Sequence, residues 1–590
     1  MTARPDTAAT PPPPIGRVTA ADRWAAWRAG ATGPRITGFA WNPPPATEGS
    51  ALRGQQLLAG DLVLGGQTTL VGDRDPWAMI PPNMAVQDAL HGFGWLDDLA
   101  SLPQNAGRAH AQAWLRGWLA RHRRGGGPGW TVDLVARRQM HLIGQGAFVL
   151  PGLSDVDRAR LLDLLGRQVG FLRARWRHAD RGPARFQALC SVVTSACALG
   201  GLDATLKPAL GILAQHCAET IDPDGGIATR NPTHLLAIFE MLTAVAACLQ
   251  DSGKPADPAI DLAIARIAPT LRSLRHTDGT LPRMQGGDGG GPKRLDAALA
   301  RTRLRPARRK GLAMGFARMG KGPASLIVDA SPPALGPGSD AAHAASLAFE
   351  LTSGPEAVVV SAGCGQRFGP AWQRAARATA SHSTLSLAGY ASARLARGSD
   401  RAGGAAQDFE TGPSRIELQQ TELKTAEGLA LNHDGWRRTH GLLHLRSLEL
   451  EHDGALLRGQ DRLAAITSDD RARLDRVLAR LAQGQGDGLS YAVRFHLHPD
   501  AVAQIDQGGT AVSIRLPSGQ IWVFRHAGET RLTLEPSVYF DASQPRPRAT
   551  KQIVLTGQLT GYGSAVSWSL ARPTGFLAAP AAADIADTED

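Results

Sequence analysis

Hydrophobic residues recur about every 3.6 positions through residues 85–276, the spacing of one face of an α-helix. The segment that begins at Asp257-Pro258 has apolar residues at Ile260, Ile264, Ile267, Leu271 and Leu274. Asp257 suits the N-cap and Pro258 the first helical position, so this stripe carries a helix start signal. Similar stripes, joined by short loops, predict seven or eight helices. Such helices pack as antiparallel pairs, and we expect them to close into an (α/α) toroid.

Beyond residue 310 the period falls to two, which is the pattern of half-buried β-strands. Tyr491, Val493, Phe495 and Leu497 alternate with polar or small residues. The run 512–524 contains two such strands around the turn Pro517–Gln520, a hairpin signal. Many short strands with this spacing predict an antiparallel β-sandwich. The fold class is therefore multidomain, with an all-α half followed by an all-β half.

These patterns divide the chain into five expected segments. They are a disordered or extended N-terminal arm (1–49), the helical toroid (50–290), a linker (291–309), the β-sandwich (310–575) and a disordered acidic tail (576–590). The linker boundary rests on the run GGDGGGPKR at residues 286–294, which is flexible by composition.

Charge favours acidic partners without naming one. The 590 residues carry a net charge of +11, and the basic residues are spread along the chain without Lys/Arg tracts. A general attraction to acidic polysaccharides or oligosaccharides follows, whereas specific nucleic-acid recognition does not. No run approaches the ~18 apolar residues of a membrane span. The first residues lack the apolar core of a secretory signal, so we expect the cytoplasm. The sequence does not decide whether the protein forms a homo-oligomer.

One candidate cluster lies between two expected helices at residues 224–234. Asp-Gly-Gly makes a tight turn there, and Arg230, Asn231 and His234 follow at the start of the next helix. A helix N-terminus favours anions through its free N–H groups. The alternative is that these residues only form a turn and a helix cap.

Two histidines, His343 and His382, each precede an expected strand. They could share a divalent metal such as zinc or calcium, or flank a substrate. The alternative is that each is a hydrogen-bonded structural residue at a strand edge.

Taken together, these segments resemble the heparinase II/III family of polysaccharide lyases. The matching stretches, in family order, are residues 89–99, 224–232, 274–279, 342–350, 380–385, 433–436 and 494–499. The resemblance implies an (α/α) toroid followed by an antiparallel β-sandwich. It also implies cleavage of uronate-containing polysaccharides by β-elimination, in relatives that are often periplasmic. That reaction needs a neutralised carboxylate, a base for the C5 proton and an acid for the leaving oxygen.

Several positions depart from the family pattern. His343 and His382 match two family metal ligands, but the family's partner histidine and aspartate fall on Ala341 and Ala345. Every tyrosine lies at or beyond residue 390, so no toroid tyrosine can transfer the proton. Ile227 stands where the family places Tyr or His. A tight metal site is therefore in doubt.

Two functions remain in competition. In the first, a polysaccharide lyase uses His234 or His343 as its base, while Arg230 and Asn231 neutralise the substrate carboxylate. The candidate substrate-binding residues are Arg185, Arg138 and Trp130. In the alternative, the protein binds acidic glycans without cleaving them, since the usual acid and base are missing.

Overall fold

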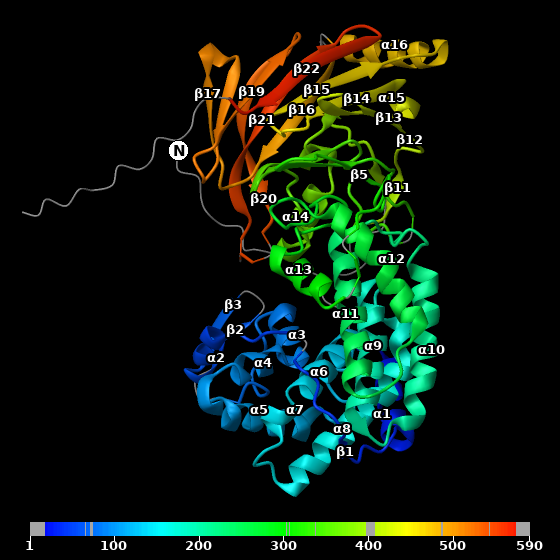
Figure 1. Ribbon diagram of the computed structural model, residues 1–590, viewed down its shortest axis with the longest axis vertical. Helices are drawn as coiled ribbons and strands as arrows, with labels where there is room; N and C mark the ends of the chain where they lie inside the picture. Colours follow the sequence, from blue (N-terminus) through cyan, green and yellow to red (C-terminus); the bar gives the residue numbers. More distant parts are fainter. Residues whose placement is uncertain are drawn as a thin grey trace, which may run out of the picture.

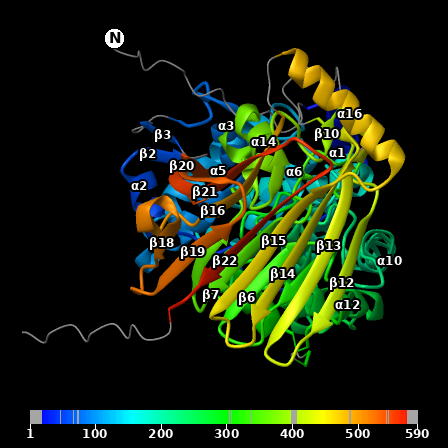
Figure 2. The same cartoon turned by 90° about the horizontal axis from the view of Figure 1, so that it is seen from above.

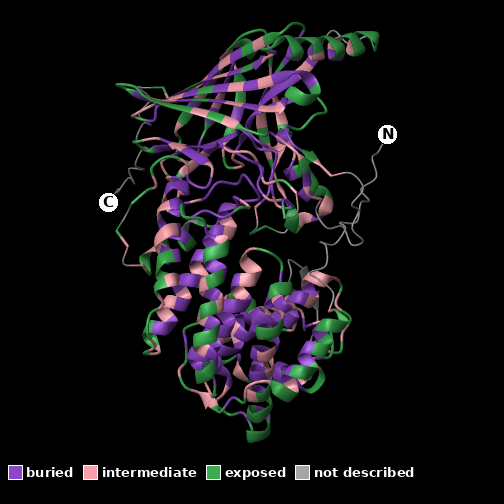
Figure 3. Cartoon of the chain, turned by 90° about the vertical axis from the view of Figure 1, so that its right-hand side faces the viewer, coloured by how far each residue is buried: buried purple, intermediate pink, exposed green. Residues whose placement is uncertain are grey.

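The computed structural model describes residues 18–573, except 46, 65–66, 71–74, 303, 306, 337, 397–406, 485–487, 542 and 545. A helical half and a β half follow each other along the chain and stack end to end (Figure 1). Buried residues are concentrated within the helical half and between the two sheets (Figure 3). The predicted fold class is confirmed.

The helical half contains most of the helices of the described chain. They are α1 (Ala20–Thr32), α2 (Ala51–Leu58), α3 (Met84–Gly92), α4 (Gly94–Ala100), α5 (Arg108–His122), α6 (Val132–Gly144), α7 (Gly146–Val149), α8 (Asp155–Arg175), α9 (Pro183–Ala198), α10 (Asp203–Thr220), α11 (Pro232–Asp251), α12 (Pro258–Leu274) and α13 (Pro292–Ala300). Between Met84 and Leu274 the predicted seven or eight helices become ten, because α4 and α7 are short extra segments.

The helices begin where the sequence supplies a cap. Asp257 accepts hydrogen bonds from the backbone N–H groups of Ala259 and Ile260, and so starts α12 as expected. Ser154 caps α8 in the same way. Such caps satisfy N–H groups that the helix itself leaves unpaired. The apolar stripe of α12 is buried at every predicted position.

Helix α11 is long and apolar enough to cross a membrane by length and composition, and among the described helices it alone passes that test. It packs between α9 and α12, and its buried side chains include Leu235, Phe239 and Leu242. A core helix has the same composition as a membrane span, and burial within the toroid accounts for this one.

Two antiparallel sheets form the β half. The first has the order β12 (Ile416–Glu422), β13 (Ala426–Trp436), β14 (Leu442–Glu451), β15 (Leu456–Ala464), β22 (Gly563–Ala571), β19 (Ile521–Ala527), β18 (Ala511–Arg515) and β17 (Val502–Asp506). The second has β20 (Arg531–Tyr539), β21 (Arg548–Leu559), β16 (Leu489–Leu497), β8 (Glu356–Val360), β7 (Phe349–Ser353), β6 (Ala324–Asp329) and β5 (Phe316–Met319), with β9 (Leu385–Leu387) also paired to β16. The predicted hairpin is β18–β19, closed at Arg515 and Ile521.

Short elements complete the fold. They are the pairs β1 (Gly38–Phe39) with β4 (Leu199–Gly200), β2 (Asp61–Leu64) with β3 (Gln67–Leu70), and β10 (Arg394–Leu395) with β11 (Phe409–Thr411), and the helices α14 (Pro370–Ala376), α15 (Arg437–His440) and α16 (Ser468–Gln483).

A buried ion pair lies inside the sandwich beside its aromatic core. Arg446 donates two hydrogen bonds to Asp461, and both side chains are fully buried. His444 and the indole N–H of Trp568 also contact this carboxylate. Burial raises the pKa of Asp461, but Arg446 and His444 outweigh burial and hold it well below its usual range. A buried charge is tolerated because its oxygens are all hydrogen-bonded.

Two predicted boundaries need correction. The expected N-terminal arm contains α1, which begins with a capping box at Thr19 and packs against α8. The expected linker contains α13, which begins at Pro292 directly after three glycines. In both places the local composition indicated a segment without regular structure, but the residues form a helix that tertiary contacts stabilise. The predicted acidic tail lies outside the described residues.

Candidate functional site

Arg230 joins the two halves of the protein. It lies just before α11 with a left-handed backbone (φ 55°), and its side chain crosses to the β half. One N–H group binds the buried carboxylate of Asp329. The other four donate to main-chain carbonyls, those of Met314, Gly315, Ser331 and Pro332. All five donors of the guanidinium are therefore engaged within the protein.

The predicted role of Arg230 is accordingly corrected. A substrate carboxylate could bind it only by displacing Asp329 or a main-chain acceptor in a buried position. The geometry makes Arg230 a structural connector between toroid and sandwich.

Asn231 is the N-cap of α11. Its side-chain oxygen accepts hydrogen bonds from the backbone N–H groups of Thr233 and His234. A side chain added at Gly286 would come within 2.8 Å of the Asn231 amide nitrogen and 2.6 Å of the Ala341 carbonyl oxygen. Asn231 therefore faces the position where the family pattern has its first histidine. Its oxygen is committed to the cap, so only the amide nitrogen is left for a ligand.

His234 is the best placed of the predicted bases. Its Nδ1 is buried and has no hydrogen-bond partner among the described residues. Burial lowers the pKa of its imidazole, while Asp340 and Asp288 act in the opposite direction. The ring is therefore neutral at pH 7 and its free nitrogen can accept a proton. Gly182, before α9, faces this atom, and a side chain there would come within 3.8 Å of it.

His343 and His382 lie together in the β half, with ring centroids 5.1 Å apart. Nδ1 of His343 and both ring nitrogens of His382 are buried, and none of the three makes a well-formed hydrogen bond with a described residue, although the backbone of Ala376 lies beside His382. Burial lowers the pKa of His382 to about 3 and that of His343 well below its usual range. Both rings are neutral at pH 7, which is the state that metal ligation requires.

These two imidazoles do not fit the predicted zinc or calcium site. A structural zinc needs four protein ligands and calcium needs six or more oxygens. In the described part of the chain, no group of three or more His, Cys, Asp or Glu is arranged to hold a metal. Ala341 and Ala345 supply no ligand beside the pair.

A chain of hydrogen bonds links the predicted residues across the junction. The Asp329 carboxylate that binds Arg230 also accepts a hydrogen bond from the Gln285 amide at 2.6 Å. Gln285 in turn bonds both the backbone N–H and the carbonyl of His343. The structure thus brings Arg230 and His343 into one network, through two residues that the sequence analysis did not single out.

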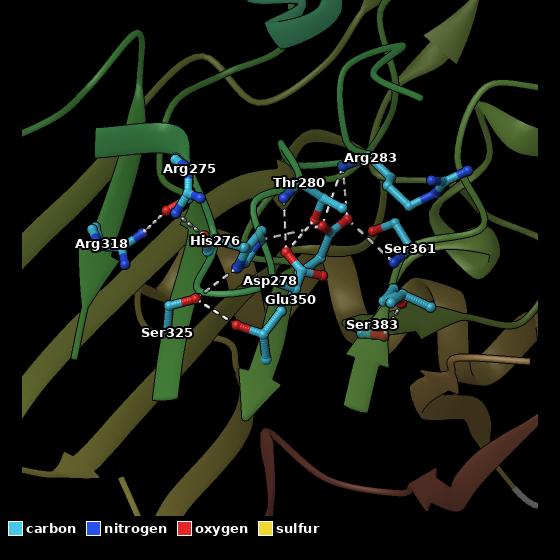
Figure 4. Close-up of polar contacts among 12 residues, drawn as sticks. Arg275, His276, Asp278, Thr280, Arg283, Arg318, Ser325, Glu350, Ser361 and Ser383 are labelled. Atoms are coloured by element: carbon cyan, nitrogen blue, oxygen red, sulfur yellow. Dashed lines mark hydrogen bonds and ion pairs between the residues drawn. The ribbon is translucent and has the colours of Figure 1, made fainter. Parts of the chain in front are cut away.

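A second buried network surrounds Glu350 on β7 (Figure 4). Its carboxylate accepts hydrogen bonds from the backbone N–H groups of Arg283 at 3.0 Å and Ser361 at 3.2 Å. His276 lies beside it, with Nε2 3.6 Å from a Glu350 oxygen and Nδ1 2.9 Å from the Ser325 hydroxyl. The sequence signal for this site was a single charged residue in the strand Phe349–Ser353, all of whose residues are buried in the structure.

Two predicted substrate-binding residues lie inside the toroid core. Arg138 and Trp130 are both 0% exposed. The Arg138 guanidinium lies 4.3 Å from the ring centre of Trp118 and donates to Gln168. Burial lowers its pKa to about 9. No ligand can reach either side chain, so their predicted role is wrong.

Arg185 is half-buried at the start of α9. It donates hydrogen bonds to the carbonyls of Ala179 and Arg177, which closes the turn before its own helix. Its role in substrate binding stays a prediction.

Comparison with known proteins places this geometry in a class. Residues 303–569 match the model of the heparinase II/III-like C-terminal domain. The structure of heparinase III superposes with a TM-score of 0.67 at 12% identity, covering 93% of this chain and 89% of that one. A mutant of the heparan sulfate lyase HepC from Pedobacter heparinus gives a TM-score of 0.56 at 14% identity, covering 94% and 88%. These likenesses define the fold, which is that of toroid-and-sandwich polysaccharide lyases.

A relative of the same length shares much more sequence. FtsZ-localized protein C of Caulobacter vibrioides (strain NA1000 / CB15N) is 31% identical over 548 residues, which is 92% of each chain. The chain belongs to the heparinase II/III-like family, with this protein as a relative over nearly its whole length.

Proposed function

We propose that this protein is a heparinase II/III-like family member that binds acidic glycans without cleaving them. One observation carries the proposal. Arg230 was predicted to bind the carboxylate of the substrate, but all five of its N–H groups donate hydrogen bonds to the protein itself. Without a neutralised carboxylate the C5 proton of a uronate is too weakly acidic to be removed.

The proton-transfer groups support the same reading. Ile227 is buried where the family has Tyr or His, and Ala341 replaces a histidine. His343 and His382 are buried neutral rings, and no carboxylate of the described residues forms a hydrogen bond with either of them. Losing one proton-transfer group costs roughly 10²–10⁴-fold in rate, and here several are missing together.

The net charge of +11 supports an acidic ligand, since a basic surface concentrates polyanions. The name of the Caulobacter relative associates that protein with FtsZ. Because the two chains align over 92% of their lengths, we extend the proposal to a glycan-binding protein that localises with FtsZ.

Parallel assays of binding and cleavage test this proposal. The full chain is titrated with heparan sulfate, hyaluronan, alginate and bacterial uronate polymers by calorimetry, while ultraviolet absorbance follows unsaturated products. Binding without an absorbance rise is expected. A rise with any polymer would refute the loss of catalysis, and no binding to any polymer would refute the glycan ligand. Co-sedimentation with FtsZ filaments tests the localisation separately.

A lyase with a rearranged site is the second candidate, and His234 favours it. In the described structure, His234 combines a neutral ring, a nitrogen without a hydrogen-bond partner and two nearby carboxylates, those of Asp340 and Asp288. If the lyase reading holds, His234→Asn abolishes an absorbance rise that His178→Gln leaves intact, because His178 is an exposed residue outside the junction.

A further inference from the structure

The outer face of the first sheet, which contains β12 to β15, carries a hollow. Its residues are distant in sequence from those of the junction. Figure 2 looks onto this face and shows β12 to β15 and β22 in front of the helical half, with α16 along one end of the strands. The hollow has a volume of about 410 Å³ and spans β12 to β15. Ligand sites typically occupy roughly 300–1,000 Å³, so it is large enough for a small ligand.

Strand register explains the shape of the hollow. Gln419, Ala430, Ser447 and Gln460 are cross-strand partners in one row on the outer face. Ala430 and Ser447 are the short members of this row, and they form a low floor between the two glutamines. Ser567 continues the row onto β22, where it accepts a hydrogen bond from Gln460 at 3.1 Å. The result is a trough that runs across the strands.

The wall of the trough is the next row, in which Glu417, Asn432, Leu445 and Arg462 are partners. The Asn432 amide donates to Glu417 at 3.0 Å, so these two hold each other in place. Arg462 is exposed and makes no hydrogen bond or ion pair with any described residue. It is a free guanidinium over a polar floor, at the opposite end of the row from Glu417.

The row of residues on the other side of the floor contains a second arginine, Arg458, and comparison with it shows that the lack of an ion-pair partner is specific to Arg462. Arg458 lies four residues earlier on the same strand and the same face, but it is paired with Glu449 at 2.8 Å and Glu451 at 3.2 Å. Its charge is neutralised by the protein. Among the described residues that line the trough, Arg462 is therefore the one cation available to a ligand carboxylate, and it lies at the β15 end.

We infer that this trough is a second binding site, for a linear acidic oligosaccharide that lies across the strands. A carboxylate of the ligand pairs with Arg462, whose fork matches both oxygens. Hydroxyl or amide groups along the chain bond the side chains of Gln419 and Gln460 and the Ser447 hydroxyl. From β12 to β15 the trough covers three strand spacings, about 14 Å, which limits the contact to a short oligosaccharide segment.

This inference goes beyond the junction, because none of the trough residues belongs to the networks of Arg230, Glu350 or His343. The inference holds whether or not the protein is catalytic, and whether or not the junction binds a glycan. A long acidic polymer could therefore be held by the β half alone.

Calorimetry on the full chain tests the site, with tetrasaccharides from heparan sulfate and from alginate as probes. Arg462→Ala removes the free cation, and Ser447→Trp fills the floor without changing charge. We expect each to weaken binding at least about tenfold, which is about 1.4 kcal/mol. Arg458→Ala is the matched control: it removes the same charge from the same strand, and affinity should stay within about twofold.

Several outcomes would overturn the inference. If both Arg462→Ala and Ser447→Trp bind with wild-type affinity, the trough is not the binding site. If Arg458→Ala weakens binding as much as Arg462→Ala does, the effect of Arg462 is only a general attraction between charges. Equal competition by single-stranded DNA would show an unselective polyanion surface. Binding lost in His234→Ala but kept in Arg462→Ala would place the glycan at the junction instead, and would leave the proposed function standing.

Discussion

Replacing Arg230 with alanine separates a structural role from a ligand-binding role. In the folded protein this side chain satisfies four main-chain carbonyls and the fully buried carboxylate of Asp329. Its removal leaves a buried carboxylate without its cation. Breaking a buried pair in this way costs about 3–5 kcal/mol of the free energy of unfolding. We expect Arg230→Ala to lose that amount.

The pH dependence of the loss provides a second measurement. Burial raises the pKa of Asp329, and Arg230 opposes that shift. In Arg230→Ala the pKa of Asp329 therefore rises further, and the folded state holds this proton more tightly than the unfolded state does. Stability then falls as pH rises. The destabilisation of the variant should be larger at pH 8 than at pH 5.

Urea unfolding followed by tryptophan fluorescence and circular dichroism provides the assay. Nine of the 13 tryptophans lie between Trp24 and Trp176, so fluorescence reports on the helical half. Arg158→Ala, an exposed arginine on α8, is the control and should be near neutral. A double-mutant cycle with Asp329→Asn should recover part of the loss. A change below about 1 kcal/mol, together with lost glycan binding, would refute the reasoning and return Arg230 to the ligand.

Three further predictions concern buried titratable groups. Asp461→Asn should destabilise the protein by about 3–5 kcal/mol at pH 7 because Arg446 loses its partner. The gap to wild type should narrow as pH falls below about 4, since the depressed pKa of Asp461 gives stability that acid removes; a gap that is constant in acid titration of the unfolding midpoint would contradict this. Burial raises the pKa of Asp133 to about 6, so its charge costs stability above that pH. Asp133→Asn should therefore raise the free energy of unfolding at pH 8 by up to about 2 kcal/mol and leave it unchanged at pH 4, as chemical denaturation can measure; equal effects at both pH values would disprove it. Neither zinc nor a chelator should shift the thermal unfolding midpoint, because His343 and His382 form an incomplete ligand set; a zinc-dependent rise that is lost in His382→Ala would show a metal site.

Local features of the fold could be predicted because their causes lie within a few residues. The cap at Asp257, the buried stripe of α12 and the hairpin between β18 and β19 all appear in the structure. Composition gave a wrong prediction where a short helix lies between turns, as at α13. There the three glycines before Pro292 indicated a linker, although the residues after them form a helix.

The candidate site could be predicted only in part. The sequence placed Arg230, Asn231 and His234 together at the start of α11, and the structure agrees. It could not tell that the Arg230 donors are taken, because their acceptors lie 84 to 102 positions away in the chain. Arg138 and Trp130 have residue types that suit sugar binding, but packing buries them completely.

The sequence by itself therefore determined the two classes of secondary structure, their order and several caps and turns, since periodicity and capping act over one or two turns of chain. Tertiary structure alone decided which polar groups are free. It committed Arg230 to the junction, left His234, His343 and His382 as neutral buried rings, and placed Arg462 unpaired over a trough of short side chains. The availability of a charge depends on partners from distant strands, and only the folded chain brings them together.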